Sequence, residues 1–149
     1  MLLTLLLQAA TPIPSVPAQP PATLVVEPVT MAIATFDSDG DGRTSRAELS
    51  AGVVRSFAAI DTTHSGSLGY IAFADWATRW LGDPNALPSP FEVDTDGDNR
   101  ITLAELQAAM ARVFARLDVD KDGFVTRKEC LTIRSMAPRA PDPRGKRKR

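Results

Sequence analysis

Residues 37–48 read DSDGDGRTSRAE, and the placement of acids in this stretch predicts the local fold. Aspartates stand at the first, third and fifth places, and a glutamate stands at the twelfth. Carboxylates two residues apart can surround one hard cation, and an acid at the twelfth place can close the shell with both of its oxygens. Gly42, at the sixth place, permits the sharp turn that such a loop needs. The stretch therefore predicts a calcium-binding loop.

The same pattern occurs twice more along the chain. Residues 94–105 read DTDGDNRITLAE, and residues 118–129 read DVDKDGFVTRKE. Asn99 takes the place of the sixth glycine in the first of these, and asparagine is the next most tolerant residue of a left-handed backbone. One run of alternating aspartates is weak evidence, because surface turns are rich in aspartate. Three runs, each closed by a glutamate twelve places along, indicate a repeated calcium loop.

These loops resemble those of the EF-hand family, in which helices flank a twelve-residue calcium loop. The resemblance implies that each loop binds one ion through its four acids and the backbone carbonyl of its seventh residue, so that the chain binds about three Ca²⁺ ions. The implied ligands are Asp37, Asp39, Asp41, Arg43 and Glu48; Asp94, Asp96, Asp98, Arg100 and Glu105; and Asp118, Asp120, Asp122, Phe124 and Glu129.

A fourth loop lies where the family pattern places one, at residues 61–72, with the sequence DTTHSGSLGYIA. It keeps Asp61 at the first place and a glycine at the sixth, but its third and fifth places carry hydroxyl side chains. Ala72 stands at the twelfth place and offers no carboxylate. We therefore expect this loop to be free of metal and to serve as the structural partner of another loop.

The spacing of the loops suggests how they are grouped. Loop starts are 24 residues apart within the first two loops and within the last two, but 33 residues separate the second start from the third. This predicts an all-α fold of two EF-hand pairs, with four helix–loop–helix hands of which the second is degenerate. The pairs span residues 29–82 and 91–137, and the Pro-rich segment 83–90 links them.

Each predicted pair shares one helix, which runs roughly over residues 45–60 in the first and 102–117 in the second. The S/T-x-x-E capping box predicts where helices begin, at Ser45, Thr102 and Thr126. At the eighth loop position, where paired loops form a short β bridge, the expected partners are Thr44 with Leu68 and Ile101 with Val125.

Apolar residues recur at the loop boundaries and at helical spacing beyond them, which predicts the inward face of each helix. The candidate core consists of Phe36, Ile60, Val93, Leu117, Leu49, Phe73, Leu106, Cys130, Phe57, Trp76, Trp80, Met110, Val113, Phe114 and Ile133.

The flanks differ from the repeats in composition. Residues 1–18 combine a short apolar run with small residues and predict an export signal, which would place the protein in the periplasm or outside the cell; a cytoplasmic protein with an apolar tail is the alternative. Residues 19–28 read as a Pro-rich linker and residues 138–149 as a basic, disordered tail.

Charge is segregated along the chain. Residues 27–136 hold 17 acidic and 11 basic side chains, a net charge of −6 that three calcium ions would neutralise. We expect no nucleic-acid partner, since no aromatic residue is interleaved with the basic tail. Membrane contact through this tail stays an unsupported alternative.

The lone His64 and the lone Cys130 favour no catalytic site, so the sequence does not predict an enzyme.

Two functions follow from these features. The first is calcium binding as an exported buffer or sensor, with an unidentified protein partner in the sensor case. The alternative is an interaction module in which calcium has only a structural role, similar to dockerin domains. Dockerins usually close their loops with aspartate and lack a helix before the first loop. The closing glutamates Glu48, Glu105 and Glu129 favour the first function.

Overall fold

The computed structural model describes residues 23–134. Its elements, in chain order, are β1 (Thr23–Val25), α1 (Pro28–Ala34), β2 (Arg43–Ser45), α2 (Arg46–Ala58), β3 (Ser67–Gly69), α3 (Tyr70–Leu81), α4 (Pro90–Val93), β4 (Arg100–Thr102), α5 (Leu103–Leu117), β5 (Phe124–Thr126) and β6 (Thr132–Arg134). Over this range no helix has the length and apolar character needed to cross a bilayer. The predicted export signal and the basic tail lie outside the described residues.

The two long helices begin where their capping boxes predict. The Ser45 hydroxyl accepts from the Glu48 backbone N–H at 3.2 Å, and the Glu48 carboxylate accepts from the Ser45 N–H at 2.9 Å. Thr102 and Glu105 make the same two bonds at the start of α5. Each box satisfies backbone donors that the first turn of a helix leaves unpaired. The glutamate that closes each loop therefore also starts the following helix.

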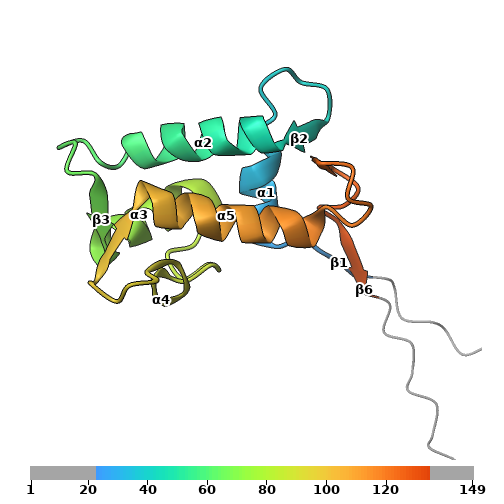
Figure 1. Ribbon diagram of the computed structural model, residues 1–149. Coiled ribbons are helices and arrows are strands. Elements are labelled where there is room, and N and C mark those ends of the chain that lie inside the picture. Colours follow the sequence, from blue (N-terminus) through green and yellow to red (C-terminus); the bar gives the residue numbers. More distant parts are fainter. Residues whose placement is uncertain (1–22, 135–149) are drawn as a thin grey trace, which may run out of the picture.

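Helices α2 and α5 lie side by side and run in opposite directions (Figure 1). The loop before α2 lies beside the loop after α5, where β2 pairs with β5, at the right of the figure. The loop after α2 lies beside the loop before α5, where β3 pairs with β4. The four loops thus form two pairs at opposite ends of one helix pair.

This pairing corrects the arrangement expected from the spacing. In the structure Thr44 lies opposite Val125, and Leu68 lies opposite Ile101. The first loop is therefore paired with the fourth and the second with the third. The prediction that neighbouring loops pair with each other, within residues 29–82 and within residues 91–137, was wrong.

The reason is the length of the helix between neighbouring loops. Helix α2 has 13 residues and α5 has 15. At 1.5 Å per residue each separates the loops at its ends by about 20 Å, whereas hydrogen-bonded strands must lie about 4.8 Å apart. Two loops joined by one uninterrupted helix cannot pair with each other. They can pair only with the loops of the other long helix.

The flanks of the last two loops also differ from the prediction of four complete hands. Helix α4, before the third loop, has only four residues. At the end of the fourth loop, residues 127–130 form a turn, and the chain then continues as β6. The predicted capping box at Thr126 does form, since its hydroxyl accepts from the Glu129 N–H at 3.3 Å, but in the described part of the chain no helix follows it.

Strand β6 pairs with β1, so the beginning and the end of the described chain are joined in an antiparallel ladder. Residues 23–25 had been assigned to a Pro-rich linker, and the structure places them in this ladder instead. The segment around them, TLVV, is rich in the apolar and β-branched residues that favour strands.

The core lies between the helices and contains most of the predicted residues. Trp76 and Phe73 stack with ring centroids 5.3 Å apart, and the Trp76 indole N–H donates to the buried Ser56 hydroxyl at 3.0 Å. Ile60, Trp80 and Val113 are only partly buried, and the side chain of Ile133 lies outside the described part. The predicted residues found buried are Phe36, Leu49, Phe57, Phe73, Trp76, Val93, Leu106, Met110, Phe114, Leu117 and Cys130.

Gly52 allows the residue before the first loop to reach the core. Phe36 is 2% exposed, and its ring lies directly against the Gly52 backbone in the middle of α2. A Cβ atom at position 52 would overlap this ring. Glycine usually weakens a helix interior, so its presence here reflects the close approach of Phe36.

We predict that Gly52→Ala lowers the free energy of unfolding by about 2 kcal/mol, because a Cβ atom that overlaps the Phe36 ring puts the cost of overpacking at the upper end of its usual range, about 3 kcal/mol, and the better helix propensity of alanine returns about 1. Urea unfolding in excess calcium measures this change. Gly69→Ala is the matched control, since a Cβ atom there meets nothing within 4 Å. Equal stability of Gly52→Ala and Gly69→Ala would contradict the prediction.

Candidate metal centres

Each loop is shaped by two left-handed residues, at its fourth and sixth places. The sixth place carries Gly42, Gly66, Asn99 and Gly123, with φ of 87°, 80°, 64° and 90°. The left-handed conformation expected of Asn99 is therefore present. The fourth place carries Gly40, His64, Gly97 and Lys121, with φ of 75°, 53°, 75° and 59°. These turns fold the chain back so that acids spaced along it converge.

Within residues 23–134, three groups of acids lie close enough to share a metal ion. In each group, one carboxylate oxygen from each of the first, third and twelfth loop residues lies within 4.8 Å of the other two. The groups are Asp37, Asp39 and Glu48; Asp94, Asp96 and Glu105; and Asp118, Asp120 and Glu129. All their donors are oxygens, which calcium prefers to nitrogen or sulfur. The donor sets fit calcium.

The acid at the fifth place of each loop is oriented by the backbone and does not belong to these groups. Asp41, Asp98 and Asp122 accept from the N–H of the residue two places on, at 3.0, 2.7 and 2.8 Å. Those residues, Arg43, Arg100 and Phe124, begin strands β2, β4 and β5. Ligation by the acids at the fifth place and by the backbone carbonyls at the seventh place stays a prediction from the family pattern.

The first acid of a loop is normally held by backbone donors. Asp37 accepts from the N–H groups of Gly40 and Gly42 at 2.7 and 2.9 Å. Asp94 accepts from Gly97 and Asn99 at 2.7 and 3.0 Å. Such bonds orient the carboxylate and favour its charged form. The pKa of Asp94 is lowered, first by a hydrogen bond from the Tyr70 hydroxyl and then by these backbone bonds.

Asp118 differs, and it gives the clearest indication of a cation. Its side chain is 3% exposed, and among the described residues its Oδ1 atom has no hydrogen-bond donor. A buried carboxylate oxygen without a partner is costly. Asp118 belongs to the group formed with Asp120 and Glu129, where a bound calcium ion would offset this cost.

The closing glutamates are held in their charged form. The Glu48 Oε2 atom accepts from the Ser45 N–H, and its Oε1 atom accepts from the Ser38 N–H at 2.8 Å. These hydrogen bonds, that from Ser45 first, lower the pKa of Glu48 to about 2. Bonds from Thr102 and Thr95 lower the pKa of Glu105 to about 2 in the same way. Burial acts to raise the pKa of Glu129, but bonds from Thr126 and Val119 outweigh it and lower the pKa.

The second loop is closed by its own hydroxyl and backbone groups. Asp61 accepts from the Ser65 N–H and hydroxyl at 2.8 and 3.0 Å, and from the Gly66 N–H at 2.8 Å. Ala72, at the twelfth place, is partly buried against the core. The single carboxylate is thus already satisfied, and the place of a closing acid is used for packing.

Three contacts between loops were not predicted from the sequence. The Tyr70 hydroxyl donates to Asp94 Oδ2 at 2.8 Å. Arg46 Nη2 lies 3.6 Å from Asp118 Oδ2, and Arg127 Nη2 lies 3.7 Å from Asp37 Oδ2. In each case the tenth residue of one loop reaches the first acid of its partner. The residue type at the tenth loop position could have indicated these contacts, but only once it is known which loops pair.

Comparison with known proteins agrees with this geometry. The family model described as "EF hand" matches residues 92–111 and 110–129. The chain is 35% identical over an aligned 123 residues to "Probable calcium-binding protein CML16" of Oryza sativa subsp. japonica, and the alignment covers 60% of this chain and 67% of that protein. The chain belongs to the EF-hand family, and calcium is its ligand.

We predict that the calcium-free protein loses stability as the pH falls from about 4.5 to about 2. Both Glu48 and Glu105 have a pKa of about 2 when folded and an ordinary value of 4.5, so below pH 4.5 the unfolded chain binds more protons. Thermal melts in chelator should show a shallower decline for Glu48→Gln/Glu105→Gln than for the unaltered protein. Asp75→Asn, which removes an exposed acid from α3, should keep the original slope. Parallel profiles for all three proteins would contradict the prediction.

Proposed function

We propose that the protein binds three calcium ions, in the loops 37–48, 94–105 and 118–129, and works as an exported calcium buffer. The observation that carries the proposal is the convergence of three acids in each of these loops, with an unsatisfied buried oxygen at Asp118. The acids at the first, third, fifth and twelfth places of each loop, with the backbone carbonyls of Arg43, Arg100 and Phe124, would hold the ions. The loop 61–72 stays free of metal and supports the strand pair with the third loop.

A buffer is supported by the way in which both loop pairs are built on the same two helices. Ions at either end would stabilise one shared core by binding only its folded form. Met110 is fully buried in that core, and no described methionine joins it in an open groove of the kind that broad-range sensors use. Calcium would therefore consolidate the fold.

A second candidate is a calcium-stabilised interaction module. Helix α4 is a single turn, and within residues 23–134 no helix follows the fourth loop, so the last two hands are incomplete, although α1 still precedes the first loop, unlike in dockerins. An open cavity of about 600 Å³, lined by both apolar and charged side chains, also lies between the start of α1, the segment 83–88 and α5, and the exposed Leu87 lies at it. The glutamates at the twelfth places still favour the first function.

The proposal includes no catalytic role. His64, the only histidine, is exposed at the tip of the metal-free loop, where it serves as a left-handed turn residue. Cys130 is buried, its Sγ atom lies 3.7 Å from the Thr30 carbonyl oxygen, and burial raises the pKa of its thiol. Neither residue has the neighbours that activate a nucleophile.

We predict that calorimetric titration saturates at three calcium ions per chain. Glu48→Gln, Glu105→Gln and Glu129→Gln should each remove one tight site, because each removes the acid that closes a loop. Ala72→Gly, at the corresponding place of the second loop, should leave three. Saturation at two or four ions in the unaltered protein would contradict the proposed assignment of loops.

We also predict that the protein isolated from its own cells begins near Gln19 and binds calcium with Kd values of about 10⁻⁴ to 10⁻³ M, as suits extracellular modules. Amino-terminal sequencing and calorimetry measure the two quantities. An intact Met1 together with Kd values of about 10⁻⁷ to 10⁻⁵ M would indicate an intracellular sensor instead.

A further inference from the structure

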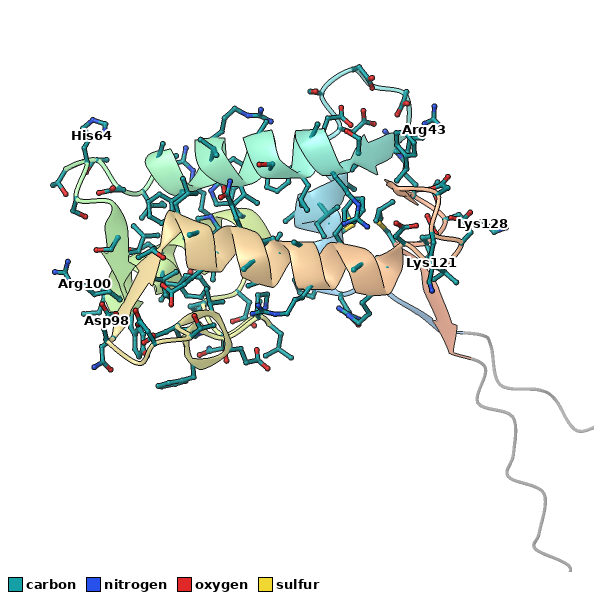
Figure 2. All side chains as sticks on the ribbon, in the orientation of Figure 1. Arg43, His64, Asp98, Arg100, Lys121 and Lys128 are labelled. Atoms are coloured by element: carbon teal, nitrogen blue, oxygen red, sulfur yellow. The ribbon has the colours of Figure 1, made fainter. Side chains whose placement is uncertain are left out.

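The two ends of the molecule differ in the charge that faces their calcium ligands. The paired loops 37–48 and 118–129 hold eight acids and five basic residues, whereas the paired loops 61–72 and 94–105 hold five acids and one arginine. Figure 2 shows Arg43, Lys121 and Lys128 at the first end, and Asp98, Arg100 and His64 at the other. Cations are therefore concentrated where two intact calcium loops meet.

Two of these cations lie against the first acid of the opposite loop. Arg46 is the tenth residue of its loop and approaches Asp118, while Arg127 is the tenth residue of its own and approaches Asp37. The contacts are reciprocal across the β2–β5 ladder. The two aspartate side chains are 3% and 5% exposed, whereas the two arginine side chains are 61% and 73% exposed, so water and salt screen each pair in part and its effect is modest.

Among residues 23–134, no basic side chain forms an ion pair with the first acid of the third intact loop. Its first acid, Asp94, receives the neutral hydroxyl of Tyr70, which is the tenth residue of the metal-free loop. The Tyr70 ring rests edge-on against Phe91 with centroids 5.2 Å apart, which places the hydroxyl. The same position in the fold thus presents a positive charge at two calcium loops and a neutral donor at the third.

We propose that Arg46 and Arg127 are built-in competitors of calcium, each lowering the affinity of the loop opposite its own. A guanidinium beside a buried carboxylate offsets its charge when no ion is bound and repels a divalent cation that the same carboxylate attracts. Loop 94–105, which faces Tyr70, then binds calcium more tightly than the other two. This inference rests on the proposed function, because it requires that these loops bind calcium.

The test uses full-length protein carrying Glu105→Gln, which leaves only the two paired sites. Adding Arg46→Gln and Arg127→Gln together should lower the calcium Kd of each remaining site by about two- to fivefold, in keeping with the modest strength of exposed ion pairs. Arg46→Lys with Arg127→Lys keeps both charges and should retain the parental Kd values. Competition with a chromophoric chelator measures these affinities.

Arg55→Gln is the matched control for the loss of positive charge. Arg55 is exposed in the last turn of the same helix as Arg46, and it makes no ion pair with any residue of the described segment 23–134. A change in Kd for the double arginine variant that is no larger than that for Arg55→Gln would overturn the proposal. A rise in Kd would also overturn it, because it would mean that the arginines position the aspartates for the ion.

Melting in chelator gives a readout that does not depend on bound calcium. Without their arginines, Asp37 and Asp118 keep uncompensated charge, so the double glutamine variant should melt at a lower temperature than Arg55→Gln. Equal melting temperatures would overturn the proposal. Each single variant, Arg46→Gln or Arg127→Gln, repeats the comparison at one site should the double variant fold poorly. Failure of the proposed function is distinguishable, since the unaltered protein would then bind no calcium in these loops.

Discussion

The rest of the structure depends on the uninterrupted helix between consecutive loops. Because α2 and α5 are straight over 13 and 15 residues, the loops at their ends are held apart. Each loop then pairs with a loop of the other helix. The two strand pairs, β2–β5 and β3–β4, thus connect the helices at both ends. What would be two separate lobes becomes one body around a shared core.

A second consequence is electrostatic. Pairing the first loop with the fourth brings two loops with converging acids together, while the loop 61–72, which lacks a closing acid, is paired with the third such loop. Carboxylates are therefore concentrated at one end, and the buried acids there are balanced by Arg46 and Arg127 rather than by a neutral hydroxyl. Self-repulsion of this kind opposes folding without metal and connects ion binding to stability.

Features that depend on a few neighbouring residues could be predicted from the sequence. Alternating aspartates and a closing glutamate identified the three acid groups, and the capping boxes at Ser45 and Thr102 identified the starts of α2 and α5. The box at Thr126 shows the limit of this reasoning, because the same local bonds form there without a helix after them. A cap satisfies the first turn, but continued helix needs an apolar face to bury.

The sequence by itself determined the shape of each loop, since its turns, acids and caps interact within twelve residues and need no other part of the chain. Only the tertiary structure decided which loops pair, because strand partners are chosen by distance across the core and neighbouring loops are separated by a rigid helix. The surroundings of Asp94 and Asp118 follow from that choice. A tyrosine or an arginine at the tenth position matters to a calcium ligand only when the partner loop is known.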